Sequence, residues 1–141
     1  MGMLRSLDGP RRCFLSTPFT PDFQPVRHQL AQMLENMGLE VPRVETLSSQ
    51  RSISERARDV LRSCHFVIAD LTQSNPSVIY ELGFAQGLGL PVLILTQDLD
   101  SAPHTMLQNN LFLVYESNHL DRIEGKIAHW IARARASGGS R

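Results

Sequence analysis

The chain has 141 residues, with 14 Lys and Arg against 14 Asp and Glu, so its formal net charge is zero. Hydrophobic residues make up 42% of it and charged residues 20%, which excludes a disordered chain and predicts one folded domain with a proper core. A chain without excess positive charge lacks the surface that nucleic-acid polymers and anionic membranes attract, so neither is an expected partner.

The two ends of the chain differ in composition from the middle. We expect residues 1–12 to form a flexible arm, residues 13–135 a single α/β domain, and residues 136–141 a flexible tail. The arm contains no long apolar run, so it predicts neither a secretory signal nor a membrane span, and a cytoplasmic location is expected. Cys13 and Cys64 are expected to be buried free thiols in a reducing compartment.

Strand and helix patterns alternate along the domain. Short apolar runs predict five strands, over residues 13–16, 39–44, 66–69, 91–95 and 111–115. Apolar residues at helical spacing predict helices over residues 26–37, 53–64, 76–89 and 120–131. Asp22 is the expected cap of the first helix, and a capping box from Ser52 to Glu55 is expected to start the second. The loop over residues 96–108 is long enough to serve as a lid or to hold a short helix.

This alternation predicts an α/β fold with a parallel sheet and helices on both faces. We expect a flavodoxin-like (Rossmann-like) sheet of five strands in the order 2-1-3-4-5. Pro42 favours the edge for the second strand, because proline cannot donate to a ladder on both sides. The first and third strands are then neighbours, and the loops after them, STPFTPD and DLTQSNPS, are expected to line one pocket.

Glu81 is a charge that needs an explanation. Asn75 and Pro76 predict a helix start, with asparagine as the N-cap and proline in the first turn. Val78 and Leu82 then lie on the buried stripe, and Glu81 lies along its edge, leaning back toward the pocket. The sequence leaves two explanations open: a functional carboxylate, or a structural one bonded to nearby backbone or to an arginine.

Asp70 ends the third strand and is expected to face the same pocket as Glu81. Two acids in one pocket suit reactions at an anomeric carbon, where a carboxylate stabilises or traps an oxocarbenium-like state. The alternative, that Asp70 caps the turn with its side chain, is equally open, and the two roles do not exclude each other. Ser16 and Thr17, at the end of the first strand, are expected to donate hydrogen bonds to a ligand.

The helix that carries Glu81 has two further features. Tyr80 precedes Glu81 but falls on a different helical face, which favours packing over substrate contact. Gly83 and Gly87 are expected to let the helix approach a neighbour closely, either the sheet or a partner subunit, at a cost of roughly 1 kcal/mol each against alanine.

Several site classes are absent from the sequence. The first strand–helix turn has neither a dinucleotide nor a P-loop pattern, so no cofactor is predicted. The histidines show no metal-ligand spacing and the cysteines form no paired motif, so no metal is predicted. Ser16 and Thr17 lack a nucleophile-elbow sequence, which makes a hydrolase triad an unsuitable explanation.

The segments FLSTPF and FVIADLTQSNPSVIYELGFAQGLGLPVLILTQ resemble the nucleoside 2-deoxyribosyltransferase-like superfamily, which includes transferases and nucleotide N-glycosidases. The Toll/interleukin-1 receptor (TIR) domains that cleave NAD form a related group. They share the flavodoxin-like arrangement of strands and helices, and they have a glutamate on the corresponding helix. The resemblance implies that Glu81 is the nucleophile, that Asp70 is the pocket aspartate, and that residues 14–19 contact the base or sugar. It also implies a residue supplied by a neighbouring subunit, for which Asn109, Asn110 and Asn118 are candidates.

Two positions depart from the pattern of many deoxyribosyltransferases. Phe14 stands where these enzymes have a tyrosine, and Asn75 stands where they have an acid six residues before the nucleophile. Both changes remove groups that place the sugar or the nucleophile. Phe14 is more similar to the residue of the nucleotide hydrolases.

The sequence therefore predicts cleavage or transfer at the N-glycosidic bond of a nucleoside or nucleotide, with Glu81 and Asp70 as catalytic residues. The candidate substrate-binding residues are Phe14, Ser16, Thr17, Phe19, Asn75 and Tyr80. Two alternatives remain: a TIR-like NAD hydrolase in defence or signalling, and a non-catalytic nucleotide-sensing or assembly module. A homo-oligomer is expected.

Overall fold

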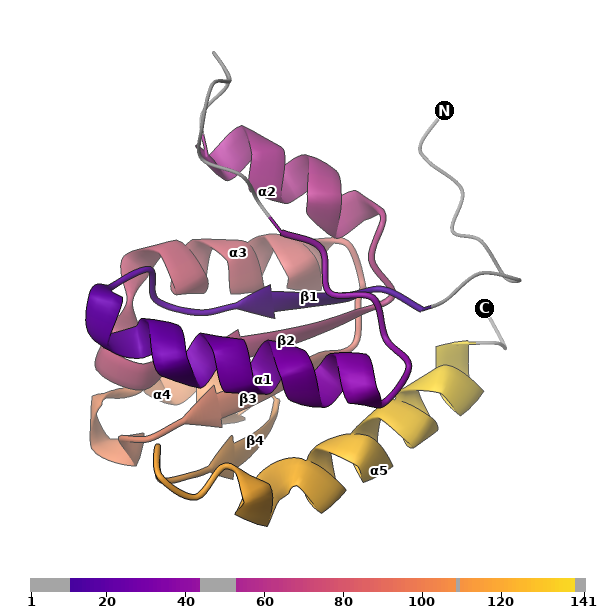
Figure 1. Cartoon of the computed structure of the whole chain (residues 1–141). Helices are drawn as coiled ribbons and strands as arrows, with labels where there is room; N and C mark the ends of the chain where they lie inside the picture. The colour runs from indigo at the N-terminus through magenta and orange to yellow at the C-terminus, as the bar shows by residue number, and fades with distance from the viewer. Residues whose placement is uncertain (1–10, 44–52, 109, 139–141) are drawn as a thin grey trace.

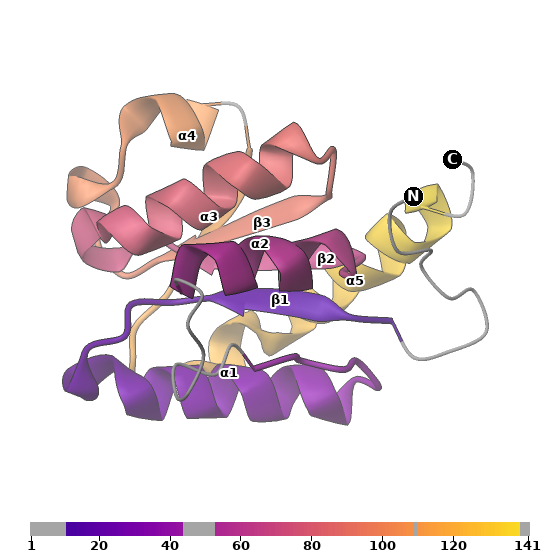
Figure 2. The ribbon, with the colours of Figure 1, turned by 90° about the horizontal axis from the view of Figure 1, so that it is seen from above.

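The computed structural model describes residues 11–43, 53–108 and 110–138. Four parallel strands form one sheet in the order β1-β2-β3-β4 (Figure 1): β1 (Cys13–Ser16), β2 (Phe66–Asp70), β3 (Val92–Thr96) and β4 (Leu111–Val114). The helices are α1 (Gln24–Asn36), α2 (Ile53–Arg62), α3 (Pro76–Gly87), α4 (His104–Gln108) and α5 (Asp121–Gly138). Figures 1 and 2 show α1 and α5 on one face of the sheet and α2, α3 and α4 on the other. None of the helices in these ranges is long and apolar enough to cross a membrane.

The expected strand over residues 39–44 is the main difference from the predicted sheet. Of its described residues, Glu40 forms a single parallel bridge with Arg12, beside β1, where the amide of Cys13 donates to the carbonyl of Glu40 at 2.9 Å. The segment thus lies at the predicted edge, but it is a bridge and not a strand. Pro42 accounts for the difference, because it has no N–H to continue a ladder. The other four strands follow the predicted order.

Both ends of the folded domain extend further than expected. The amide of Glu40 donates to the carbonyl of Arg11, and Arg12 Nη1 donates to Ser63 Oγ at 2.5 Å, so residues 11 and 12 belong to the fold. At the other end, α5 continues through Gly138, three residues into the expected tail. Residues 1–10 of the expected arm lie outside the described residues.

Alternation along the strands divides the core between the two faces of the sheet. Leu15 and Ile68 pack with residues of α1 and α5, whereas Phe14 and Val67 pack with residues of α2 and α3. Ala69 continues the second set, in a cluster with residues of α3 and α4. Because successive side chains point to opposite faces, the last residues of the strands are assigned to a face in the same way.

The predicted start of α3 is confirmed, whereas the predicted cap of α1 is wrong. Asn75 Oδ1 accepts from the amides of Ser77 and Val78 at 3.0 and 3.3 Å, with Pro76 as the first residue of α3, as predicted. Asp22 does not cap α1, because a 3-10 turn over Pro21–Phe23 precedes the helix and moves its start to Gln24, which has no side-chain cap. Ser52 of the expected capping box lies outside the described residues.

The structure also tests the expected lid or short helix after β3 and the expected role of the two glycines in α3. The loop over residues 96–108 holds a short helix, α4, which is one of its two predicted uses. A Cβ added at Gly83 or Gly87 would meet no atom within 4 Å. The predicted close approach of α3 to the sheet at these glycines is therefore wrong, and both positions face open space.

Candidate active site

The side chains of Glu81 and Ser16 meet at the end of β1. Ser16 Oγ donates to Glu81 Oε1 at 2.5 Å across 65 positions of sequence, and the two residues are 1% and 7% exposed. Ser16 shares its face of the sheet with Phe14, two residues earlier, which is the face that α3 covers. Burial raises the pKa of Glu81 above its usual value, while the Ser16 hydrogen bond and the charge of Arg27 lower it.

Arg27 of α1 holds the chain that follows β1. Its Nη1 donates to the carbonyl oxygen of Leu15 and to Thr17 Oγ1, each at 2.9 Å. Its guanidinium also lies over the ring of Phe19, with 5.7 Å between the guanidinium carbon and the ring centroid. Burial lowers the pKa of Arg27, and the negative charge of Glu81 raises it. The protein thus places a guanidinium near the buried carboxylate, and each favours the charged form of the other.

Arg27 is the functional candidate that sequence reasoning missed. Its signal is the one that identified Glu81: a charge directly beside a buried position, here Val26. That signal alone is weak, because many helical charges flank an apolar stripe. The contacts with Leu15 and Thr17 become visible only when α1 lies against the end of β1.

Asp70 lies at the centre of a buried hydrogen-bond network. Its Oδ1 accepts from the amide of Thr72 at 3.0 Å and from the hydroxyl of Thr72 at 2.5 Å, and its Oδ2 accepts from the hydroxyl of Tyr115. Gln97 Nε2 donates to the Tyr115 hydroxyl at 3.1 Å. Burial raises the pKa of Asp70, and the hydrogen bonds from Thr72 and Tyr115 oppose that rise. The aspartate therefore ties the turn after β2 to the ends of β3 and β4.

The structure does not bring Asp70 and Glu81 together as expected. Asp70 has the parity of Ile68, which faces α1 and α5, and its partner Tyr115 belongs to the same core. Glu81 lies on the opposite face, where α3 packs. Asp70 is 0% exposed, and its two carboxylate oxygens accept hydrogen bonds from Thr72 and Tyr115. These contacts match the turn-capping role that the sequence left open.

The turn that Asp70 anchors is conformationally strained. Gln73 and Ser74 have φ angles of 65° and 49°, in the left-handed region that residues other than glycine rarely adopt. The hydroxyl of Ser74 donates to the carbonyl oxygen of Ser101, which adds a second attachment. Because Asn75 follows directly and caps α3, this turn sets where the Glu81 helix begins.

The other predicted substrate-binding residues fall into different environments. Thr17 is 1% exposed and accepts from Arg27, and Phe19 is 47% exposed beneath the same guanidinium. Phe14 is 3% exposed inside the core between β1 and α2, so the expected direct contact with base or sugar is not supported. Asn75 Oδ1 is engaged by the α3 cap. Tyr80 is 46% exposed on α3.

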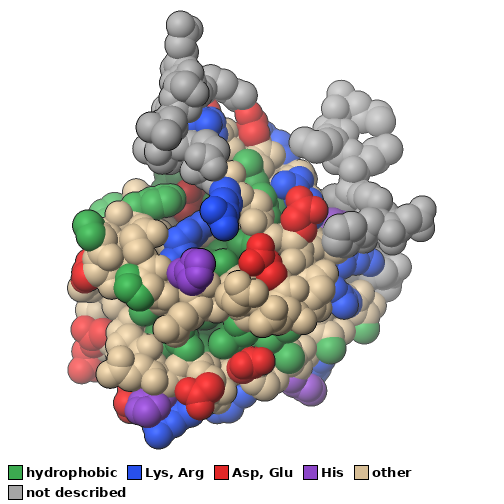
Figure 3. All heavy atoms as spheres, viewed as in Figure 1, with side chains coloured by type: hydrophobic (Ala, Val, Ile, Leu, Met, Phe, Trp, Pro, Cys, Tyr) green, Lys and Arg blue, Asp and Glu red, His purple; other side chains and the backbone are tan. Residues whose placement is uncertain are grey.

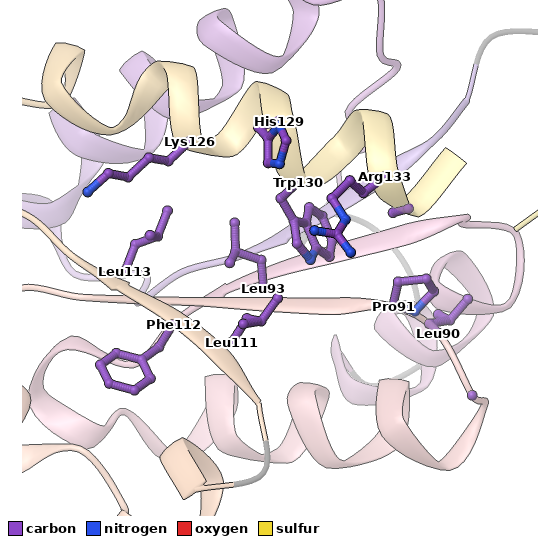
Figure 4. A pocket seen from close by; sticks show the side chains of 12 residues that line it. Leu90, Pro91, Leu93, Leu111, Phe112, Leu113, Lys126, His129, Trp130 and Arg133 are labelled. Carbon is purple, nitrogen blue, oxygen red and sulfur yellow. The ribbon is translucent and has the colours of Figure 1, made fainter. Parts of the chain in front are cut away.

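Hollows in the described surface lie both near this site and away from it. One of about 240 Å³ includes Arg27 and Phe19 in its lining. A larger one, of about 600 Å³, lies between α5 and the starts of β3 and β4; Figure 4 shows Trp130 and Arg133 of α5 facing Leu93 and Leu111 across it. Parallel sheets bind ligands at the carboxyl ends of their strands, so the larger hollow lies at the opposite edge from the expected site. In the part of the chain that the structure describes, no three His, Cys, Asp or Glu side chains are grouped to hold a metal ion.

Comparisons with solved structures give the same architecture. The chain is similar to the CMP N-glycosidase BcmB of Clostridium botulinum, with a TM-score of 0.69, 18% identity, and coverage of 85% of this chain and 99% of that one. It is also similar to the 2-deoxyribosyltransferase of Bacillus psychrosaccharolyticus, with a TM-score of 0.54, 19% identity, and coverage of 76% and 88%. The TIR domains of the Roq1 resistosome match with a TM-score of 0.54, 17% identity, and coverage of 92% and 84%. At these identities the likeness concerns the fold.

The sequence comparisons are more specific. No curated protein sequence matches the chain. The family described as nucleoside 2-deoxyribosyltransferase matches residues 14–123, a span that runs from β1 into α5 and includes Ser16, Arg27, Asp70 and Glu81. The chain therefore belongs to the nucleoside 2-deoxyribosyltransferase family.

Proposed function

We propose that the protein cleaves or transfers at the N-glycosidic bond of a nucleoside or nucleotide, with Glu81 as the nucleophile. The observation that carries the proposal is the buried carboxylate of Glu81, held by Ser16 at the carboxyl end of β1 with the charge of Arg27 nearby. Membership of the family and the likeness to a CMP N-glycosidase support the choice of bond.

The reaction divides into two displacements at the anomeric carbon. An oxygen of Glu81 attacks that carbon, and the base leaves with the electron pair of the C–N bond and takes a proton from solvent. The resulting ester is then attacked at the same carbon, by water in a hydrolase or by a second base in a transferase, which returns the carboxylate. Ser16 fixes one carboxylate oxygen, so the other is available for attack.

Asp70 is proposed as a positioning residue in this scheme. It acts through the turn over residues 71–75, which it holds with Thr72 and Tyr115 and which determines where α3 begins. Phe19, which is 47% exposed beneath Arg27, is the proposed substrate-facing residue of the loop after β1, and buried Thr17 helps to hold Arg27 in place.

The test is a panel of substrates assayed by chromatography for release of the free base. The panel contains ribonucleosides, deoxyribonucleosides, their 5′-monophosphates and NAD, each with and without a second base as acceptor. Release from any nucleoside or monophosphate supports the proposal, and a new nucleoside formed with the acceptor marks a transferase. Cleavage of NAD and of no other compound would favour the TIR-like alternative over the proposal. No release of base from any compound in the panel would contradict the proposal.

The rate of base release is expected to fall as the pH drops through the raised pKa of Glu81, because the nucleophile must be ionised. The Arg27→Gln variant removes a charge that lowers this pKa, so the acid side of its pH profile should move to higher pH. Arg27→Lys keeps the charge and should stay closer to the parent. The measurement is kcat/KM against pH for the three proteins, and an unmoved profile in Arg27→Gln would contradict the assignment.

The expected homo-oligomer stays a prediction. The face of α3 that carries Tyr80, Gly83 and Gly87 is exposed, and nothing lies within 4 Å of a Cβ added at either glycine, so this face is available to a second copy. Light scattering of the purified protein measures the state directly. A Tyr80→Glu variant that dissociates an oligomer found in the parent would locate the contact on α3.

A further inference from the structure

The strand β4 forms one edge of the sheet. It pairs with β3 on one side, and no strand of the described residues pairs with its outer side. The amide of Tyr115 donates to the carbonyl oxygen of Thr96 of β3, so the backbone groups of alternate residues in β4 point toward β3. By the same alternation, the N–H and C=O groups of Phe112 and Val114 point away from the sheet. These groups are in position to pair with a further strand.

The side chains of β4 are apolar on both faces of this edge. Leu111, Phe112 and Val114 are exposed, and the strand, LFLV, contains no charge, proline or bulge. Figure 4 shows Leu113 directed toward α5 and Phe112 directed away from it. Charges, prolines and bulges are means by which proteins keep an edge strand from pairing with other chains. The outer side of β4 therefore has the properties of a docking site for an extended segment.

A row of basic side chains on α5 lies beside this edge. Arg122, Lys126, His129 and Arg133 are exposed and follow one another at intervals of three or four residues, so they share one face of the helix. The last three line the hollow of about 600 Å³ between α5 and the starts of β3 and β4, whose described lining contains no acid. Figure 3 shows Lys or Arg and His side chains along the lower rim of the molecule, where Figure 1 shows α5.

The charge of this row determines which kind of segment fits. Like charges one turn apart destabilise a helix slightly, and acidic side chains placed beside them would offset that repulsion. Glu116, which lines a smaller hollow with Arg122, is the acid in the described lining of the two hollows beside α5. A second copy of the chain fits poorly, because two-fold pairing of β4 with β4 would bring the two basic rows toward each other across the axis.

We propose that β4 binds an extended acidic segment of another protein, which adds to the sheet as a further strand. Its backbone pairs with Phe112 and Val114, and its apolar side chains cover these two residues on the face of α3 and α4. Its acidic side chains, at alternate positions, lie on the face of α5 near Lys126 and Arg133. The interaction does not depend on the proposed reaction, because β4 and the β1 end of the sheet, where Glu81 lies, are opposite edges.

The test measures the fluorescence of Trp130, which lines the hollow and is the only tryptophan of the chain. The probe is a synthetic octapeptide with blocked ends in which glutamate and valine alternate, titrated into the full chain at low salt. We expect saturable binding at least about tenfold tighter than that of the same peptide with lysine in place of glutamate, because several charge pairs change sign. A peptide with its four glutamates before its four valines should bind more weakly, because it cannot separate the two kinds of side chain onto two faces.

Two substitutions at Val114 test the backbone pairing. Val114→Pro removes the outward N–H, and proline is tolerated in an edge strand where the N–H faces away from the sheet. It should weaken binding of the acidic peptide at least about fivefold, as expected for one lost hydrogen bond. Val114→Ala keeps the N–H and should bind more tightly than Val114→Pro. A peptide methylated at alternate amide nitrogens tests the same pairing in the unaltered protein, and it should also bind more weakly.

Two arginine variants of α5 test the role of the basic row. Arg133→Glu reverses a charge in the row and should weaken binding of the acidic peptide by about tenfold. Arg135→Glu makes the same change at an exposed position on another face of α5, and it should bind the peptide as the parent does. Thermal melting followed by circular dichroism checks that each variant is folded. Equal losses in the two arginine variants would indicate net charge rather than a site, and would overturn the proposal.

The remaining outcomes also overturn the proposal. These are unchanged binding in a folded Val114→Pro or of the methylated peptide, equal binding of the glutamate and lysine peptides, and no binding of the acidic peptide. A dimer of the parent that Val114→Pro dissociates, measured by light scattering, would assign the edge to a second copy instead. Binding of phosphatidylglycerol vesicles without binding of the peptide would assign it to a membrane surface. Each outcome can be read whether or not the parent releases base.

Discussion

Replacing Glu81 by glutamine is expected to lower the rate of base release by at least about a thousandfold, because the amide keeps the shape of the side chain but cannot displace the base. The measurement is single-turnover release of base from the best substrate of the parent, followed by chromatography. A trapped glycosyl-enzyme, detected by mass spectrometry in the parent and absent from Glu81→Gln, would identify Glu81 as the attacking residue. A matched control is Glu124→Gln, which neutralises an exposed glutamate of α5 and should keep the parent rate.

The same variant separates a chemical role from a structural one. Since burial raises the pKa of Glu81, the folded protein at neutral pH holds an unfavourable charge that glutamine removes. Glu81→Gln is therefore expected to melt higher than the parent at pH 7. Its advantage should shrink as the pH falls through the raised pKa, where the carboxyl of the folded parent becomes protonated, and should be smallest below the ordinary value of 4.5, where the carboxyl of the unfolded parent is protonated as well. A variant that is inactive and melts lower at pH 7 would indicate that Glu81 is mainly structural.

The Asp70→Ala substitution is expected to be the most destabilising of the site variants, at about 3 kcal/mol or more. It leaves the amide and hydroxyl of Thr72 and the hydroxyl of Tyr115 without their buried acceptor, and each unpaired group of this kind costs about 1–3 kcal/mol. Thermal melting measures the effect, and in a domain of this size each kcal/mol corresponds to roughly 3 °C.

Two milder substitutions test whether the network, and not the charge of Asp70, is responsible. Asp70→Asn keeps an acceptor for the amide of Thr72 and should cost less than Asp70→Ala. Tyr115→Phe removes the bond to Asp70 and the acceptor of Gln97, at about 1–2 kcal/mol. If Asp70→Ala melted like the parent but lost base release, Asp70 would act on the substrate and the positioning role proposed for it would be wrong.

Predictions that depend on residues close together in the sequence are confirmed by the structure. Asn75 and Pro76 begin α3 as predicted, because a cap depends on groups within three residues of each other. Helical spacing also placed Glu81 beside the buried face, where it is 7% exposed. The order of four of the five predicted strands is right, since alternating strands and helices with short connections allow few arrangements.

Predictions are wrong where two neighbouring residues favour different local structures. Asp22 is a good cap by itself, but Pro21 starts a 3-10 turn that uses the same residues. The segment that begins at Leu39 has strand-forming residues, but Pro42 limits it to the bridge at Glu40. Asp70 is the last residue of β2 and has the parity of the core residue Ile68, so its side chain lies on the face that α1 and α5 cover and not, as predicted, in one pocket with Glu81.

The sequence by itself determined the class of fold, the start of α3 and the position of a carboxylate at the edge of its buried stripe, because these depend on propensity, periodicity and capping within short segments. The tertiary structure decided which groups meet that carboxylate. Ser16, 65 residues from Glu81, reaches it only because β1 lies beneath α3, and Arg27 approaches because α1 packs across the end of β1. The same packing sends Asp70 to Tyr115 and away from Glu81. Contacts between distant residues depend on strand register and on the face to which each side chain points, and neither is encoded in a local pattern.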